Sequence, residues 1–466
     1  MRGKTPRSGS AASPGAGDVP ASLATMAAMA GPARIVTVDV EQPLPDLQPD
    51  EHYRNAWVVM CRGGVPHSMV ILDLTIGASA LESRLKELLA HARTSTEVVE
   101  RPALADAELP RISVVVPTIA SRIEELGHCI EAVGELDYPD FEVLLVDNRR
   151  VLPTPDPLPA LVQGRPWLRV LREPRPGVSA ARNAGVAAAS GEIVTFTDDD
   201  VRVDREWLRA IGTRFALNPR VEAVTGLILP SELETPAQIW FERYYGGFSG
   251  ERTFAPVTLE ADPSCRRLLS GSRVLVRDAN DIELRRISIL AVGGYGAGAN
   301  MAFRKSTLER IGGFDCTLGV GTPARGGEDL AIVIAILWTG GQVGYEPAAF
   351  VHHRHRREYA ELLKQIDGYG LGFAAMLASL VRNDPRNLLR VLSQLPRVLQ
   401  WKAFQLVQRI RGGRARGSGD EATTPPYPFR MLYREFRSYL PGPLAHLRSR
   451  SAWRKATADH ASSDVR

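Results

Sequence analysis

Residues 191–200 read GEIVTFTDDD, an apolar segment that runs directly into three consecutive aspartates. The pattern predicts a strand buried on both faces, with Asp198, Asp199 and Asp200 in the turn after it. Adjacent carboxylates repel one another, and a hard divalent cation with oxygen ligands offsets that charge, so the triplet predicts a site for Mg²⁺ or Mn²⁺. The alternative is a solvated acidic turn in which Asp204 caps the following helix.

Other short apolar segments, separated by helical patterns, precede this strand. Residues 112–116, 141–146 and 168–171 predict three further strands. Strands that alternate with helices predict an α/β fold with a doubly wound, mostly parallel sheet. Such a sheet binds its ligands at the carboxyl ends of the strands, where Pro117 and Asp147 follow two of the predicted strands.

A second acidic pair, Glu328 and Asp329, follows a glycine-rich loop and opens the apolar segment 330–338. A carboxylate held at the start of a helix can deprotonate an acceptor hydroxyl. Acidic residues at a helix start can equally do no more than complement the helix macrodipole.

Two further segments carry groups that suit a metal or a phosphate. Residues 352–357 read HHRHRR, in which His353 or His355 would complete a metal shell and the arginines would neutralise phosphate. The alternative is a basic surface patch. Residues 176–185 read PGVSAARNAG, and Arg182 either points to a diphosphate or lies on a small-residue helix that only packs on the sheet.

Composition changes along the chain predict five parts. They are a disordered leader (1–32), a small α+β domain (33–95), a linker (96–110), the α/β catalytic domain (111–357) and a basic, helical extension (358–466). In the extension, residues 359–381 and 388–410 have helical patterns, and residues 448–466 are expected to fray.

The overall composition excludes several classes of protein. A formal net charge of +4 over 466 residues gives little support to nucleic-acid binding. The 4 cysteines have no metal-ligand spacing, which suits a reducing, cytoplasmic location. No segment approaches the roughly 20 apolar residues that span a bilayer, so any membrane contact is predicted to be peripheral. The basic extension favours such contact at the inner face of a membrane, and the alternative is that it covers the active site.

In this order, the segments resemble those of the family 2 glycosyltransferases, which have the GT-A fold. The matching segments are ISVVVPT (112–118), YPDFEVLLVDN (138–148), GVSAARNAG (177–185), GEIVTFTDDD (191–200), GAGANMAFRK (296–305), GGFD (312–315), GGEDL (326–330) and YEPAAFVHHRHR (345–356). They cover about half of the chain, and their ordered combination is more specific than any one of them.

The resemblance implies a role for each candidate residue. Pro117, Thr118, Asp147, Arg182 and Asp198 would contact the nucleotide. Asp198 and Asp200 would hold Mn²⁺ or Mg²⁺ with His353, although the double histidine leaves His352 and His355 possible. Asp329 would be the general base, and Glu328 beside it would help to place the acceptor.

The resemblance also implies the reaction, an inverting displacement that moves a sugar from a UDP-, GDP- or dTDP-linked donor to an acceptor hydroxyl. The acceptor would be a glycan, a lipid-linked molecule or a small molecule, in cell-wall or polysaccharide biosynthesis. The chain has no Gln-x-x-Arg-Trp motif, which indicates a non-processive enzyme. The alternatives are a nucleotidyltransferase, disfavoured because no glycine follows Pro117 up to residue 122, and a non-catalytic sugar-nucleotide-binding or scaffold protein.

Overall fold

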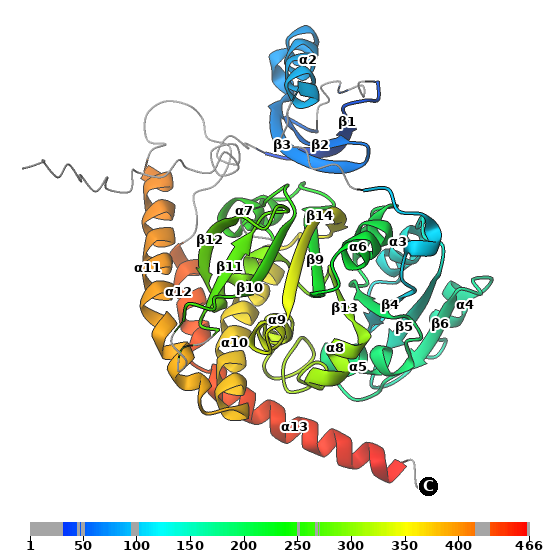
Figure 1. The fold of residues 1–466 in the computed structure, drawn as a ribbon, viewed down its shortest axis with the longest axis vertical. Coiled ribbons are helices and arrows are strands. Elements are labelled where there is room, and N and C mark those ends of the chain that lie inside the picture. The colour runs from blue at the N-terminus through cyan, green and yellow to red at the C-terminus, as the bar shows by residue number, and fades with distance from the viewer. Residues whose placement is uncertain are drawn as a thin grey trace, which may run out of the picture.

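A computed structural model describes most of the chain, and Figure 1 shows a small N-terminal unit, an α/β body and C-terminal helices, of which α13 runs below the body while the others lie at one flank. The described residues are 31–43, 47, 52–94, 102–248, 252–265, 269, 271–414 and 429–463. Residues 1–30 of the predicted leader and 96–101 of the predicted linker lie outside them. The rest of the linker contains the short helix η2 (Asp106–Glu108).

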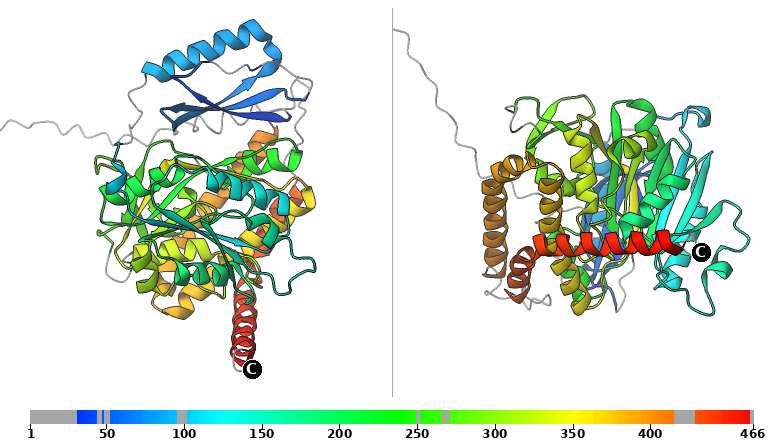
Figure 2. Two further views of the ribbon diagram at one scale, coloured as in Figure 1. Left: turned by 90° about the vertical axis from the view of Figure 1, so that its right-hand side faces the viewer. Right: turned by 90° about the horizontal axis from the view of Figure 1, so that it is seen from below.

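The N-terminal unit is a three-stranded sheet with one helix. Strands β1 (Ala33–Asp39), β2 (Asn55–Arg62) and β3 (Val65–Asp73) lie side by side, β1 parallel and β3 antiparallel to β2. Gly63 and Gly64, both with positive φ, form the tight turn between β2 and β3. Helix α2 (Ala78–Thr94) covers the outer face of this sheet, and its leucines are buried there (Figure 2). The predicted α+β unit is therefore present.

Strand β2 is buried on both faces. Its side chains alternate, so that Val58 faces α2 while Trp57 and Cys61 face the α/β body. A backbone hydrogen bond connects the two parts, in which Ala33 N donates to Leu233 O at 2.8 Å. The N-terminal sheet and the body therefore share one hydrophobic core.

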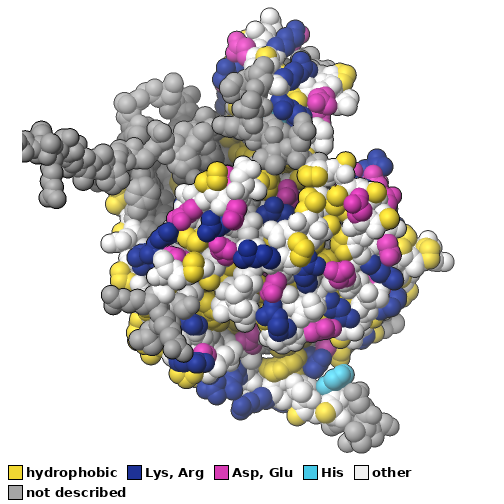
Figure 3. Space-filling view, viewed as in Figure 1, with side chains coloured by type: hydrophobic (Ala, Val, Ile, Leu, Met, Phe, Trp, Pro, Cys, Tyr) yellow, Lys and Arg dark blue, Asp and Glu magenta, His cyan; other side chains and the backbone are white. Residues whose placement is uncertain are grey.

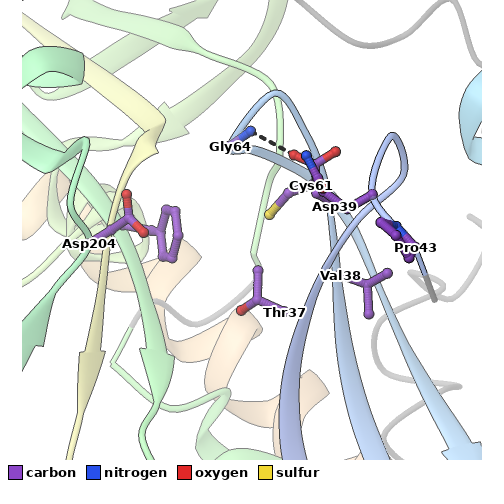
Figure 4. A pocket seen from close by; sticks show the side chains of 9 residues that line it. Thr37, Val38, Asp39, Pro43, Cys61, Gly64 and Asp204 are labelled. Carbon is purple, nitrogen blue, oxygen red and sulfur yellow. Dashed lines mark hydrogen bonds between the residues drawn. The ribbon is translucent and has the colours of Figure 1, made fainter. Parts of the chain in front are cut away.

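A cavity of about 300 Å³ remains between the two parts (Figure 4). Thr37, Asp39 and Cys61 of the N-terminal sheet line it on one side, and Asp204 and Phe350 of the body line it on the other. None of the residues predicted to form the active site lines this cavity.

The central sheet contains 11 strands among the described residues, in the order β12-β11-β10-β14-β9-β13-β7-β4-β5-β6, with β8 paired to β14. Strands β4, β5, β6, β7, β9 and β14 run in the same direction, with β13 antiparallel between β7 and β9. The predicted α/β fold with a mostly parallel sheet is thus confirmed, and antiparallel strands extend it at one edge. The strands are β4 (Ile112–Thr118), β5 (Phe141–Asp147), β6 (Leu168–Arg172), β7 (Ile193–Phe196), β8 (Val201–Val203), β9 (Val221–Pro230), β10 (Val257–Ala261), β11 (Arg273–Arg277), β12 (Glu283–Ser288), β13 (Met301–Arg304) and β14 (Gln342–His353).

Helices cover both faces of this sheet, which explains why every residue of β4 is buried. Helices α3 (Ile123–Gly134) and α6 (Trp207–Leu217) pack on one face, and α5 (Val178–Ala188) and α9 (Glu328–Trp338) on the other. Gly185 of α5 lies so close to the sheet that a Cβ there would be 2.4 Å from a methyl carbon of Val115. Among the described residues, the body also contains α4 (Leu158–Val162), α7 (Pro236–Tyr245), α8 (Lys305–Ile311) and the 3-10 helix η4 (Ile289–Tyr295).

The side chain of Asn300 bridges an interruption in the pairing of β9 with β14. The register of this pair shifts between residues 346 and 351. There, Asn300 Nδ2 donates to Leu227 O at 3.1 Å and to Ala349 O at 2.7 Å, while its Oδ1 accepts from Trp207 Nε1 at 2.9 Å. Gly226 is required beside it, because a Cβ would lie 1.9 Å from Ala349 O. These contacts hold the strand whose last residue is His353.

The C-terminal extension is helical, as predicted. Helix α10 (Tyr359–Asn383) packs against the body, and α11 (Asn387–Arg414), α12 (Phe429–Tyr439) and α13 (Gly442–Ser463) lie around it (Figures 1 and 2). The prediction that residues 448–466 fray is wrong up to Ser463, because α13 continues to that residue; residues 464–466 lie outside the described part of the chain. None of the described helices is long and apolar enough to cross a membrane.

Candidate active site

Strand pairing brings three predicted metal ligands together. The aspartate triplet lies between β7 and β8, and β8 pairs with the end of β14 so that Val201 stands opposite His353. As a result, His353 Nε2 lies 3.5 Å from Asp200 Oδ1 and 4.0 Å from Asp198 Oδ2. These separations are close to those of two ligands that each lie about 2.1 Å from one ion.

His353 presents the ring nitrogen that a metal needs. Its Nδ1 lies 2.9 Å from Arg354 O, and a carbonyl oxygen only accepts, so Nδ1 carries the proton. In the neutral imidazole the lone pair is then on Nε2, which faces the two aspartates. The ring of Phe248 lies against the imidazole at a centroid distance of 4.2 Å and holds its plane. In a typical metal-ligand histidine, one ring nitrogen donates a hydrogen bond to a backbone carbonyl, and this bond orients the second ring nitrogen toward the metal.

The neighbouring histidines point elsewhere. His352 precedes His353 on the strand and so lies on its other face, where burial lowers its pKa to about 4. His355 Nε2 lies 2.5 Å from Glu242 Oε1, and both side chains are fully buried. Among the described residues, the possible metal cluster contains only Asp198, Asp200 and His353.

Two arginines, in addition to His353, surround Asp200. Arg122 Nη1 lies 2.9 Å and Arg356 Nη1 3.3 Å from Asp200 Oδ2. Burial alone would raise the pKa of Asp200, but His353, Arg356 and Arg122 together hold it below its usual range. Asp200 is therefore an ionised carboxylate in a largely buried position, which is the state a cation ligand requires.

The middle aspartate has a different role. Thr118 Oγ1, at the end of β4, donates to Asp199 Oδ2 at 2.6 Å. The Thr118 hydroxyl oxygen also accepts from Ala120 N at 2.8 Å. Burial raises the pKa of Asp199 to about 6. The contact ties the loop after Pro117 to the aspartate triplet, because β4 and β7 are adjacent strands.

Asp147, the last residue of β5, is almost fully buried. Its two carboxylate oxygens accept from Arg149 Nε and Nη2, each at 2.8 Å, and Arg172 Nη1 lies 3.4 Å from Oδ1. Burial alone would raise the pKa of Asp147, but its bonds to Arg149 and the charge of Arg172 keep it below the usual range. Asp147 therefore lies at the predicted strand end, and both of its carboxylate oxygens accept hydrogen bonds from Arg149.

Arg182 is a bridge between the two acidic groups of the site. Its side chain is 3% exposed; Nη1 lies 3.0 Å from Glu328 Oε1, and Nη2 lies 3.3 Å from Asp198 Oδ1. Nη2 also donates to Gly298 O at 3.2 Å. Burial, reinforced by the neighbouring Asp329, raises the pKa of Glu328 well above its usual range, and Arg182 opposes that shift. Arg182 thus lies behind the carboxylates instead of projecting into open space.

Asp329 is held by two backbone groups. Its Oδ2 accepts from Gly298 N at 3.1 Å and its Oδ1 accepts from Leu330 N at 2.8 Å. The side chain is only partly buried, in contrast to that of Glu328. Gly298 therefore connects Asp329 to Arg182, and through Arg182 to Asp198.

Arg122 and Arg356 were not singled out from the sequence as partners of Asp200. Arg122 is the N-cap residue of α3, the helix after β4. Because β4 and β7 are adjacent in the sheet, a doubly wound topology would have predicted that Arg122 lies near the aspartates that follow β7. Arg356 follows His353 by three residues, and only the position of that histidine identifies it. The buried set of Glu242, His355 and Arg252 was also missed, because it joins three distant segments.

Comparison with known proteins agrees with this architecture. Residues 113–265 match the family described as Glycosyl transferase family 2. The chain therefore carries a family 2 glycosyltransferase domain, and the resemblance predicted from its motifs is confirmed. The match includes the aspartate triplet and Arg182 and ends before Asp329 and His353.

Individual relatives are glycosyltransferases of several kinds. A pre-mycofactocin glycosyltransferase of Mycobacterium tuberculosis is 28% identical over 228 residues, which are 48% of this chain and 40% of that protein. Glycosyltransferase AglE of Haloferax volcanii is 34% identical over 109 residues, 22% of this chain and 36% of that protein. The solved structure of the mannosyltransferase PcManGT from Pyrobaculum calidifontis, in complex with GDP-Man and Mn²⁺, aligns with 83% of this chain and 89% of its own at 18% identity and a TM-score of 0.41. The chain thus spans about 40% of the length of the first of these relatives.

Proposed function

We propose that the protein is an inverting, metal-dependent glycosyltransferase that moves one sugar from a nucleoside-diphosphate donor to an acceptor hydroxyl. The observation that carries the proposal is the cluster of Asp198, Asp200 and His353, connected through Arg182 and Gly298 to the carboxylate of Asp329. A nucleotidyltransferase and a scaffold gain no support from a specific contact in the site.

The donor set fits a divalent cation. Two carboxylates and an imidazole nitrogen with its lone pair exposed are ligands that Mn²⁺ and Mg²⁺ accept. Asp198, Asp200 and His353 would hold the ion, which when bound supplies positive charge beside the departing diphosphate. Arg182 acts by holding Asp198 and Glu328 in place, because its own guanidinium is buried between them.

The nucleotide would lie along the carboxyl ends of β4 and β5. Thr118 keeps the loop after Pro117 against the aspartate triplet and so shapes the wall of this site. Both oxygens of Asp147 are bonded to Arg149, so Asp147 contacts the nucleotide only if one of these bonds opens.

Asp329 is the general base of the proposed reaction. The acceptor oxygen forms a bond to the anomeric carbon, the bond from that carbon to the diphosphate oxygen breaks, and the hydroxyl proton passes to the Asp329 carboxylate. The backbone bonds from Gly298 and Leu330 orient this carboxylate, and orientation of a reacting group is itself a large part of catalysis. The lack of a Gln-x-x-Arg-Trp motif supports transfer of single sugars over processive synthesis.

Two measurements test the proposal. A thermal-shift screen of UDP, GDP, dTDP and CMP with Mn²⁺, Mg²⁺ or EDTA should show stabilisation by one nucleotide only when metal is present. A ligand at about a hundred times its dissociation constant stabilises the fold by about 2.7 kcal/mol, which such a screen detects. If a nucleotide raises the melting temperature equally with metal and with EDTA, nucleotide binding does not depend on a metal ion, and the proposed metal dependence is wrong.

The second measurement separates binding from chemistry. With the donor found by the screen, Asp329→Asn should lower turnover by about 10²–10⁴ while the metal-dependent nucleotide shift stays unchanged. The matched control is Asp281→Asn, in the exposed turn between β11 and β12, which should keep full activity. Near-normal turnover of Asp329→Asn would show that another group accepts the proton.

A further inference from the structure

Helices α11, α12 and α13, with the turn between the last two, carry half of the large apolar side chains that are exposed in the described part of the chain. Of 22 such residues, 11 lie between Leu388 and Leu447. Five of them lie close together in the sequence: two are three residues apart on α12, one is in the turn after α12, and two are three residues apart at the start of α13, so that each helical pair lies on one side of its helix. This apolar row consists of Tyr433, Phe436, Leu440, Leu444 and Leu447.

Packing on the opposite side keeps the row facing outward. On α12, the side chain of Ser438 is buried so closely against α10 that a Cβ on Gly370 would lie 1.8 Å from its Oγ. On α13, Ala445 and His446 are buried, and His446 Nδ1 lies 3.3 Å from Thr317 Oγ1 of the body. The two helices are thus anchored, yet Tyr433 remains 68% and Leu440 79% exposed. Burial against the rest of the described chain does not account for these side chains.

The exposed charged side chains among residues 433–455 are all basic, whereas the partly buried Arg434 is paired with Asp367 of α10. Residues 433–455 contain six basic side chains and one acidic side chain, Glu435, which is buried. Arg437, Arg448, Arg454 and Lys455 are all exposed. Figure 3 shows dark blue side chains beside yellow ones along the lower edge of the molecule, where α13 runs. The outer side of this helix pair is therefore apolar and positively charged.

We propose that the apolar row docks onto an anionic lipid bilayer. Tyr433, Phe436 and Leu440 would insert at the level of the headgroups, and Arg437 and Arg448 would contact lipid phosphates. Amphipathic helices with aromatic and leucine side chains flanked by Lys or Arg bind membranes in this way. A second copy of the chain is a poorer occupant, because a two-fold interface over the row would bring like-charged arginines together.

This proposal stands apart from the donor chemistry and is tested with the full chain. We expect co-sedimentation with vesicles of phosphatidylcholine and phosphatidylglycerol, little with phosphatidylcholine alone, and weakening by salt. The double variant Tyr433→Ser/Leu440→Ser should lower vesicle binding by more than about tenfold, since each side chain loses its burial in the lipid. The double variant Arg437→Gln/Arg448→Gln should bind more weakly and lose most of the salt dependence.

The matched control is Leu217→Ser/Leu284→Ser, which alters two leucines that are 53% and 55% exposed but lie far from the row in sequence. It should bind vesicles as the parent does, and all variants should keep the metal-dependent nucleotide shift, so the two proposals fail separately. Absence of binding to anionic vesicles, or equal loss in the control, overturns the membrane proposal. Self-association seen by light scattering and abolished by Tyr433→Ser/Leu440→Ser would instead assign the row to a second copy of this chain.

Discussion

Removing the Arg182 guanidinium should cost far more stability when Glu328 is present than when it is not. Arg182 is 3% exposed and Glu328 8% exposed, so neither charge is solvated if the other is lost. Breaking a buried ion pair by removing one partner costs about 3–5 kcal/mol. We therefore expect Arg182→Met to destabilise the protein by about 4 kcal/mol at a pH well above the raised pKa of Glu328, where this carboxylate is ionised, and Glu328→Gln by only about 1 kcal/mol because the amide oxygen still accepts from Arg182.

The double variant isolates the interaction. In Arg182→Met/Glu328→Gln no buried charge is left without a partner, and the remaining cost is the unpaired carbonyl of Gly298, worth about 1–2 kcal/mol. The double variant should accordingly be about 3–4 kcal/mol more stable than the sum of the single effects. The free energies of unfolding come from urea denaturation of the four proteins, followed by circular dichroism.

A control cycle uses the same residue types on the surface. Arg286 and Glu283 form an exposed pair at 2.7 Å, and Arg286→Met with Glu283→Gln should show no measurable coupling. If the effects of Arg182→Met and Glu328→Gln add within about 0.5 kcal/mol, the two residues do not depend on each other and the bridging role of Arg182 is refuted.

Three further changes test the fold around the site. Asn300→Ala leaves two carbonyl oxygens and an indole N–H without their partner and should destabilise by about 3 kcal/mol or more in urea denaturation, whereas Asn280→Ala, in an exposed turn, should not. Gly226→Ala puts a methyl group 1.9 Å from a carbonyl oxygen of β14 and should lower the melting temperature and the metal-dependent nucleotide shift together; an unchanged melting temperature would show that the strands can separate there at little cost. Burial alone would raise the pKa of Glu242, but Arg252 and His355 lower it to about 2. The ionised Glu242 carboxylate therefore stabilises the fold above pH 4.5, and this stabilisation is lost as the pH falls toward 2. Glu242→Gln should therefore flatten the fall in stability between these pH values, and an unchanged slope would contradict the assignment.

Much of the sheet and part of the site could be predicted because they depend on local patterns. The strand before Asp198 is buried on both faces, so its apolar run was visible in the sequence, and the carboxylates had to follow at its end. The same holds for β4, which ends at Thr118, and β5, which ends at Asp147.

The partners of these carboxylates could not be predicted in the same way. Arg122 and Arg356 reach Asp200 from positions 78 and 156 residues away, and such contacts depend on strand order. The orientation of Arg182 was also unpredictable, because the sequence shows a basic residue on a small-residue helix but not the burial of Glu328 beside it. The choice of His353 over its neighbours required the alternation of side chains along β14 and the pairing of its end with β8.

The double burial of β2 has a consequence for the order in which the protein is made. The inner face of the N-terminal sheet, with Trp57, is covered by the body, and the backbone bond from Ala33 reaches Leu233. Between those two positions lie about 200 residues of chain, which a ribosome takes on the order of ten seconds or more to synthesise. During that interval α2 can cover the outer face of the N-terminal sheet, but the body that covers the inner face has not yet been synthesised. The inner face, which includes the side chain of Trp57, is therefore exposed to aggregation in the nascent chain until the later strands emerge.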